Sequence, residues 1–221
     1  MPHFVNPSQR YYISTNYEVL YTLLYHQPCL QLVRPKNMRV HAFLNRFTPF
    51  HLRRHFLLVR DPYKRAVSFY KDKFRQVPLD KWLTYDELQS CQRLFCPHID
   101  LTPNDSPAEI RHKLLSVSFA QFINLLPQVY QRDAHLRPQT QLIMIFFRGM
   151  PIKLKFDRIL KVELADDLAY LQDELSIDLS KRHNSTHKIQ LPNPWDPSLL
   201  AVVNNLYRAD FEAFNYEMRT V

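Results

Sequence analysis

The chain has 221 residues, of which 46% are hydrophobic and 23% charged, a composition typical of a globular protein that buries a sizeable core. Lys and Arg total 29 against 21 Asp and Glu, and the formal net charge of +8 favours anionic partners: a nucleotide, a polyanionic glycan or a nucleic acid. The single glycine, Gly149, excludes glycine-rich phosphate loops of the Walker and dinucleotide types, which need several glycines.

The three cysteines, Cys29, Cys91 and Cys96, leave at least one unpaired, which argues against a disulfide scaffold. Cys91, Cys96 and His98 lack the usual pair spacings of metal ligands, so we expect no metal. Residues 1–9 have neither a basic start nor an apolar core, and no stretch reaches the length of a membrane span. We therefore expect a cytoplasmic protein without stable membrane insertion, and nothing in the sequence indicates an oligomeric state.

Two stretches of distinct composition come early in the chain. Residues 19–25 are rich in β-formers and are predicted to form the first central strand. Residues 34–55 are strongly basic and include Arg34, Lys36, Arg39, Arg46, Arg53 and Arg54. This segment is interpreted either as a solvated surface or as an electropositive wall that steers an anionic substrate, and we favour the wall.

Residues 56–74 are the stretch around which the chain is organised. Phe56 to Val59 form a short apolar run, typical of a strand covered on both faces. Asp61 is a good N-cap, and Pro62 suits the first helical position because no N–H is needed there. An amphipathic helix follows, and its apolar side chains are predicted to face the sheet: Val67, Tyr70 and Phe74.

Arg60 lies at the carboxyl end of the predicted strand, beside the N–H groups of the helix start. In open α/β sheets ligands bind at this edge, and a helix N-terminus with an adjacent arginine favours a phosphate. The alternative is a surface arginine that pairs with Asp61. The spacing alone leaves both interpretations open.

The pattern Arg-Asp-Pro-x-x-Arg-x-x-Ser-x-Tyr resembles the 3′-phosphate-binding motif of the sulfotransferases, most closely that of the carbohydrate sulfotransferases of the chondroitin and dermatan group. The matching residues are Arg60, Asp61, Pro62, Arg65, Ser68 and Tyr70. The resemblance implies that Arg60 and Ser68 hold the 3′-phosphate of the donor substrate, 3′-phosphoadenosine 5′-phosphosulfate (PAPS). We also expect an α/β fold, a single domain over residues 1–221 with a central parallel β-sheet flanked by helices, as in the P-loop-like sulfotransferase fold.

The sulfotransferases have a second donor-binding segment, a Pro-Lys-x-x-Cys/Gly-Thr-Ser/Asn loop that wraps the 5′-phosphosulfate. Residues 26–31 resemble it, with Cys29 in the place of the family's Cys. The resemblance implies that Gln27, Cys29 and Gln31 contact the donor. His26 stands where the family has the lysine that stabilises charge on the bridging oxygen, so His26 is predicted to supply part of that catalytic role.

Residues 76–115 interrupt the alternation of strands and helices with four prolines and clustered polar residues. They are predicted to be a loop-rich insertion, and in the related enzymes such regions shape recognition of the acceptor. Trp82 and Tyr85 are candidates for stacking on a sugar, with local packing as the alternative.

A helix is predicted from Ser118, a typical cap, to Pro127, which closes it. After it, His135, Pro138 and Gln139 match the family's His-x-x-Pro-Gln signature. The resemblance implies that His135 is the general base that takes the acceptor proton, and an imidazole suits this work because it ordinarily titrates near neutrality. The alternative is a structural or exposed histidine.

The last third of the chain returns to strands and helices. Residues 158–163 are predicted to be a strand, and residues 164–175 a helix with an apolar stripe. Asn184 belongs to a His-Asn-Ser-Thr segment that resembles a polar loop near the donor in relatives, which makes it a candidate donor-binding residue; turn chemistry alone also explains it. The last helix is predicted to begin at Asp196 and to end in the segment 207–216, which resembles the family's terminal Tyr-x-x-Asp-Phe-x-x-Phe-x-Tyr.

These features together predict PAPS-dependent transfer of a sulfuryl group to a hydroxyl of a carbohydrate acceptor. As the resemblance implies, transfer is direct and in line, with no metal and no covalent intermediate. A first alternative is a catalytically weakened relative that binds the nucleotide or an anionic glycan without turnover, because His26 replaces the loop lysine. A second is a basic nucleic-acid-binding module; the sequence has neither aromatic RNP segments nor a zinc framework, so no nucleic-acid partner is predicted.

Overall fold

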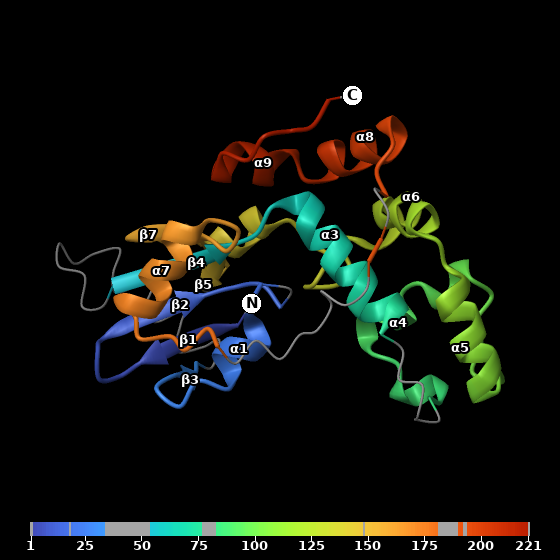
Figure 1. Ribbon diagram of the computed structural model, residues 1–221, viewed down its shortest axis with the longest axis horizontal. Coiled ribbons are helices and arrows are strands. Elements are labelled where there is room, and N and C mark those ends of the chain that lie inside the picture. The colour runs from blue at the N-terminus through green and yellow to red at the C-terminus, as the bar shows by residue number, and fades with distance from the viewer. Residues whose placement is uncertain are drawn as a thin grey trace. The chain divides into compact units, whose positions relative to one another are not determined.

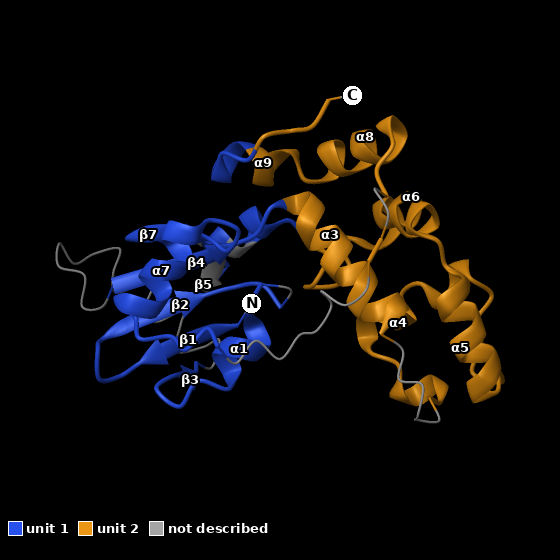
Figure 2. Ribbon diagram, in the orientation of Figure 1, with its two compact units in different colours: residues 1–61, 138–184, 212–216 blue, residues 62–137, 185–211, 217–221 orange. Residues whose placement is uncertain are grey.

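The computed structural model describes residues 2–17, 19–33, 54–76, 83–147, 149–180, 190–191 and 194–220. Three predicted features lie wholly or largely outside these residues: the basic stretch 34–55, Trp82 and Asn184. The chain forms two compact units (Figure 2). Unit 1 comprises residues 1–61, 138–184 and 212–216, and unit 2 comprises residues 62–137, 185–211 and 217–221. The expectation of a single domain over residues 1–221 stays a prediction.

The described part of unit 1 is built on a five-stranded sheet of order β3-β1-β2-β4-β7 (Figure 1). Its strands are β1 (His3–Asn6), β2 (Tyr11–Ser14), β3 (Gln31–Leu32), β4 (Arg54–Val59) and β7 (Arg158–Lys161). β2, β4 and β7 are parallel, whereas β1 is antiparallel to β2 and β3. The predicted α/β class is confirmed. The sheet is mixed because only residues 7–10 connect β1 to β2, and so short a link permits only antiparallel pairing.

The prediction that residues 19–25 form the first central strand was wrong. The strand is β2, which precedes them, and Tyr21–Tyr25 form a helix, α1. Val19, Leu23 and Leu24 are all buried, while Tyr25 is exposed. Leu23 and Leu24 are neighbours that are buried in the same cluster, as one face of a helix allows, and this pattern overrides the β-forming composition of the segment.

The core of unit 1 covers both faces of the sheet. On one face, residues of the strands pack with α1 and with α7 (Ala165–Asp173): Phe4, Ile13, Phe56, Leu58, Leu160, Leu23, Leu24 and Leu171. On the other face, Leu57 and Val59 of β4 pack with Phe214. Alternate residues of β4 therefore enter two different clusters, as the apolar run 56–59 predicts for a strand covered on both sides.

A separate two-stranded hairpin completes the described strands of unit 1. It pairs β5 (Met144–Phe147) with β6 (Met150–Lys153) and follows a short 3₁₀ helix, η4 (Gln139–Ile143). Gly149 in its turn has φ +80°, a left-handed conformation that a residue without Cβ adopts without strain.

Unit 2 is helical in its described residues. Its elements are α3 (Pro62–Tyr70), a π-helical extension η1 (Lys71–Arg75), η2 (Tyr85–Glu87), α4 (Ser90–Arg93), η3 (Cys96–His98), α5 (Pro107–Ser116), α6 (Phe119–Val129), α8 (Pro197–Leu206) and most of α9 (Arg208–Phe214). Pro62 occupies the first position of α3, as predicted. The rings of Tyr70 and Phe74, which were predicted to face the sheet, lie 5.7 and 5.8 Å from Phe122 of α6. The apolar stripe of α3 thus builds the core of unit 2.

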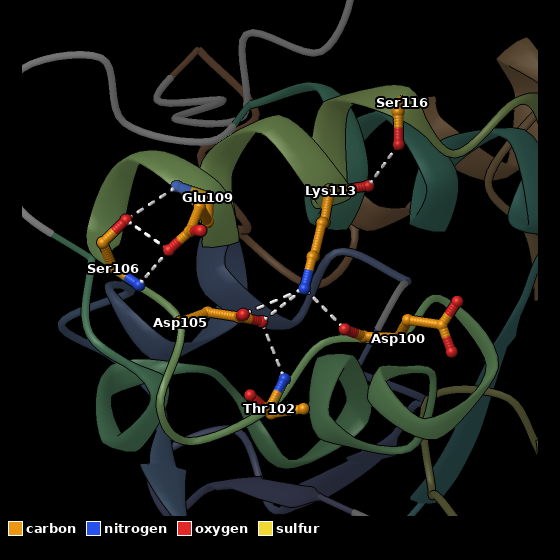
Figure 3. A network of polar contacts seen from close by, with 7 residues as sticks. All are labelled: Asp100, Thr102, Asp105, Ser106, Glu109, Lys113 and Ser116. Atoms are coloured by element: carbon orange, nitrogen blue, oxygen red, sulfur yellow. Dashed lines mark hydrogen bonds and ion pairs between the residues drawn. The ribbon is translucent and has the colours of Figure 1, made fainter.

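The segment predicted as a loop-rich insertion contains α5, a helix of ten residues. Figure 3 shows the polar network at its start. Ser106 Oγ accepts from the backbone N of Glu109, and Lys113 Nζ donates to both carboxylate oxygens of Asp105 at 2.9 and 2.8 Å. The hydrogen bond from Lys113 is the main cause of the lowered pKa of Asp105. This network fastens the preceding turn to α5, so side-chain bonds order a segment whose prolines suggest a loop.

The predicted helix starts at Ser118 and Asp196 are confirmed. Each side chain accepts a hydrogen bond from the backbone N three residues on, at 3.1 and 3.0 Å. Pro127 does not close α6, because it removes only one backbone donor and the N of Tyr130 still donates to Leu126 O. None of the helices in the described part of the chain is both long and apolar enough to cross a membrane.

Candidate functional site

The carboxyl ends of β2 and β4 define one edge of the sheet in unit 1. The two strands are parallel neighbours, with Ser14 opposite Leu57. Residues 15–20 leave this edge after β2, and Arg60 leaves it after β4. Ligands of open α/β sheets bind at the carboxyl ends of the strands, so this edge is the candidate site.

The backbone of Arg60 is held by one buried side chain, that of Gln139. Arg60 N donates to Gln139 Oε1 at 2.9 Å, and Gln139 Nε2 donates to Arg60 O at 2.8 Å. Gln139 is 0% exposed and begins η4. A single amide group therefore satisfies both the donor and the acceptor of Arg60.

A carboxylate, that of Glu163, fixes the next part of the same turn. Its Oε1 accepts from Asp61 N at 2.9 Å and lies 3.9 Å from Arg60 Nε, while its Oε2 accepts from the Tyr216 hydroxyl at 3.1 Å. Burial and the nearby Glu163 carboxylate raise the pKa of Tyr216, so this hydroxyl keeps its proton and donates. The structure pairs the Arg60 side chain with Glu163, and both interpretations of Arg60 stay predictions.

The Arg60 side chain is 26% exposed, so it reaches solvent at the sheet edge while its backbone is fixed. A guanidinium in this position offers a permanent positive charge and planar donors, which suit a phosphate. The backbone N–H groups of Arg60 and Asp61 already donate hydrogen bonds to Gln139 and Glu163, respectively. Recognition of an anion here therefore depends on the Arg60 side chain more than on these two backbone groups.

The other matching residues of the motif lie in unit 2. Ser68 is half-buried on α3, about two helical turns after its first residue. Arg65 is only 3% exposed, pairs with Asp210 at 3.8 Å and lies over the ring of Tyr207 at 4.8 Å. Arg65 thus belongs to the core of unit 2, and the structure does not present it to a ligand.

His135, also in unit 2, forms a close pair with Asp133. Asp133 Oδ1 accepts from His135 N at 2.8 Å and lies 2.5 Å from His135 Nδ1. Burial raises the pKa of Asp133, but the hydrogen bonds from the side chain and backbone of His135 outweigh it and leave that pKa below its ordinary value. A carboxylate only accepts, so Nδ1 carries the proton and Nε2 carries the basic lone pair. Asp133 was not among the residues predicted for the site, although its position two residues before His135 is a visible signal in the sequence.

The segment that carries His135 is held from the C-terminal part of unit 2. The Tyr207 hydroxyl donates to the carbonyl oxygen of Leu136 at 2.8 Å. Burial raises the pKa of Tyr207 to about 12, so the hydroxyl stays protonated over the working range of an enzyme. Tyr207 and Asp210 both lie in the predicted terminal segment. Tyr207 contacts the segment that carries His135, and Asp210 pairs with Arg65 of the 3′-phosphate motif.

Residues 26–31, predicted to wrap the 5′-phosphosulfate, lie at the opposite end of the sheet. Gln27 Nε2 donates to Asp178 O at 2.9 Å, and Gln27 Oε1 accepts from Asp178 N at 3.1 Å. Nearby, Gln9, which precedes β2, donates to Ser176. Cys29 is half-buried against the core, and burial raises the pKa of its thiol. These contacts place the segment beside the amino end of β2.

The register of the sheet measures this separation. Gln31 lies opposite Val5, which lies opposite Tyr12, which lies opposite His55. Arg60 comes five residues after His55, about 17 Å further along the strand direction, and β3 is three strands away from β4.

The structure therefore corrects the position of the predicted loop. PAPS carries its two phosphate groups on one ribose, and His26, Gln27, Cys29 and Gln31 are too far from Arg60 to share that ribose with it. His26 and Gln31 are exposed at the opposite end of the sheet, and the Gln27 side chain is hydrogen-bonded to the backbone of Asp178.

Residues 15–17, 19 and 20, which follow β2, lie at the Arg60 edge. Thr15 Oγ1 donates to Val19 O at 2.5 Å, Val19 N donates to Asn16 O at 3.0 Å, and Leu20 has φ +54° just before α1. This compact turn was missed because the strand before it was placed at 19–25. The Tyr-Tyr-Ile-Ser run at 11–14, equally rich in β-formers, was the available signal.

The fold and the Arg60 turn define an α/β protein with a candidate anion site at the carboxyl edge of its parallel strands. The model of the sulfotransferase family matches residues 12–217, and the chain belongs to that family. Family membership supports a transferase that moves sulfuryl groups. A comparison with solved structures finds no match. Among the described residues, no group of three or more His, Cys, Asp or Glu is arranged to hold a metal ion.

Proposed function

We propose that the protein transfers the sulfuryl group of PAPS to a hydroxyl of a carbohydrate. The observation that carries the proposal is the Arg60 turn, where a partly exposed arginine side chain follows a parallel strand and the backbone of the turn is fixed by buried Gln139 and by Glu163. Family membership supports the reaction class. The cytoplasmic location expected from the sequence stays a prediction.

Three groups have roles in the proposed reaction. The Arg60 guanidinium binds the 3′-phosphate by charge-assisted hydrogen bonds, and the Ser68 hydroxyl adds a donor, as the family resemblance implies. His135 Nε2 takes the proton of the acceptor hydroxyl, whose oxygen forms the new bond to sulfur. The bond from sulfur to the bridging oxygen breaks, and adenosine 3′,5′-bisphosphate leaves.

The 5′ side of the donor falls to residues 15–20 rather than to residues 26–31, because the former leave the same sheet edge as Arg60. Developing negative charge on the bridging oxygen requires a cation or fixed donors. The whole stretch 11–33 contains neither Lys nor Arg. This deficit favours a second candidate function, a sulfotransferase-like protein that binds the nucleotide or an anionic glycan and turns over slowly or not at all.

Two measurements on the full chain separate these functions. Adenosine 3′,5′-bisphosphate should raise the thermal midpoint, since a ligand of the native state stabilises it by mass action. Transfer of labelled sulfate from PAPS to a panel of glycans tests turnover. Stabilisation with transfer supports the enzyme, and stabilisation without transfer supports the binding protein. No stabilisation and no transfer would overturn both.

A further inference from the structure

We infer that Gln139 is a positioning residue for the 3′-phosphate site: its side chain fixes the backbone from which Arg60 reaches the ligand. This inference rests on the proposed function. Gln139 makes the two hydrogen bonds to Arg60 at 2.9 and 2.8 Å and is wholly buried, so it cannot itself meet a ligand in solvent.

The Gln139 amide continues the sheet by one residue. β4 and β7 pair up to Val59 and Lys161, and Val162 N donates to Val59 O at 3.1 Å. This pairing ends one residue before Arg60. The Gln139 side chain supplies one acceptor and one donor to Arg60, as an adjacent strand would. Both the backbone N and the backbone O of Arg60 are thereby hydrogen-bonded to the Gln139 amide.

This anchoring matters because an arginine side chain is long and flexible. Bidentate contact with a phosphate needs the guanidinium plane in one orientation, and a fixed backbone removes part of the freedom that binding would otherwise have to restrict. Glu163 restrains the same turn from the next residue, through Asp61 N and Arg60 Nε. The position of the cation therefore depends on two side chains that need not touch the phosphate.

The chain offers a matched control in Gln27. Its amide makes the same reciprocal pair of bonds, to the backbone of Asp178, and it too is buried. The contacts of Gln27 lie at the amino end of β2, away from Arg60. A change at Gln27 thus disturbs the fold in a similar way without disturbing the Arg60 turn.

The test compares two probes by calorimetry: adenosine 3′,5′-bisphosphate and adenosine 5′-phosphate, which lacks the 3′-phosphate. The ratio of their affinities reports the 3′-phosphate contact alone. At about pH 7.5, Gln139→Glu should lower this ratio about tenfold, because a carboxylate cannot donate to Arg60 O and brings a negative charge. At about pH 5.5 the ratio should return to within about twofold of wild type at the same pH, since a protonated carboxyl has the donor and acceptor of the amide and burial favours that form.

Gln139→Met separates position from charge. It fills a similar volume without hydrogen bonds or charge, and it should lower the ratio about tenfold at both pH values. Gln27→Glu should keep the wild-type ratio at both. Circular dichroism of each variant checks that the fold is retained.

Three results would overturn the inference: a wild-type ratio in folded Gln139→Met, no recovery of Gln139→Glu at low pH, or an equal loss in Gln27→Glu. Failure of the proposed function looks different. In that case wild type itself binds the bisphosphate no better than adenosine 5′-phosphate, and the inference falls with the function on which it rests.

Discussion

Oδ1 of Asp133 lies 2.5 Å from Nδ1 of His135 and also accepts the backbone N–H of the same residue. This double contact fixes the ring orientation and the tautomer, and it leaves Nε2 as the basic atom. In hydrolases, a carboxylate that holds a histidine in this way sustains general-base catalysis without being protonated. In the proposed reaction, Asp133 would therefore position His135.

Asp133→Asn should reduce turnover about 10²–10⁴-fold with little change in donor affinity, because the amide of Asn can donate to Nδ1 and favour the wrong tautomer. The check is the single-turnover rate of sulfate transfer at saturating acceptor. Because the folded-state pKa of Asp133 is depressed, its stabilising contribution is present at neutral pH and is lost as the pH falls through that pKa. The wild-type advantage in unfolding free energy should thus shrink below pH 3.8. Undiminished turnover in the variant would remove Asp133 from catalysis.

Arg60→Ala should abolish most of the thermal stabilisation by adenosine 3′,5′-bisphosphate, since a charge-assisted contact is worth about 1.5–3 kcal/mol. Any stabilisation by adenosine 5′-phosphate, which lacks the 3′-phosphate, should be the same in the variant as in wild type. Thermal melts with both nucleotides provide the measurement. If the variant responds to the bisphosphate as wild type does, another residue holds the 3′-phosphate.

Tyr207→Phe removes the hydrogen bond to the carbonyl of Leu136 and should lower stability by about 1 kcal/mol. It should also lower turnover, because the bond restrains the residue that follows His135. Tyr11→Phe is the matched control: its hydroxyl donates to Leu175 O at 2.7 Å, and burial raises its pKa to about 12 as well. Urea unfolding and turnover are measured for both. Equal losses of turnover would show that Tyr207 acts only through stability.

The Arg65–Asp210 pair should behave as a buried ion pair, with side chains 3% and 0% exposed. Arg65→Met alone should cost about 3–5 kcal/mol, because it leaves the Asp210 charge without compensation. The double variant Arg65→Met, Asp210→Leu should be more stable than either single one. Urea unfolding of the four proteins gives the coupling energy. Additive losses would show that the two charges do not interact across their 3.8 Å separation.

The sequence predicted the local parts of the site and missed the distant ones for a physical reason. The segment of β4, Arg60 and α3 is continuous in the sequence, and an apolar run followed by Asp-Pro indicates both the strand and the helix start. Gln139 and Arg60 are 79 positions apart, and no local pattern encodes a contact at that separation. Asp133, by contrast, was within reach of a local interpretation.

The misplaced loop had a different cause. Residues 19–25 have the composition of a strand but form a turn and a helix, so a prediction from composition is wrong here. The phosphosulfate loop was therefore predicted at 26–31, at the other end of the sheet from Arg60. The register of β3 with β1 and β2, which reveals the difference, is a property of pairing and is not contained in any one segment.

A charge swap tests which of the two segments faces the donor. Tyr17→Lys and His26→Lys each introduce a lysine, and both residues have exposed side chains, at the carboxyl edge and at the opposite end respectively. Tyr17→Lys should strengthen PAPS binding about fivefold at low salt, since two unit charges about 4 Å apart gain about 1 kcal/mol in water. The gain should fade as salt rises. His26→Lys should leave the affinity within about twofold of wild type. Titration of PAPS by calorimetry at two salt concentrations decides the matter, and a gain confined to His26→Lys would return the 5′ site to residues 26–31.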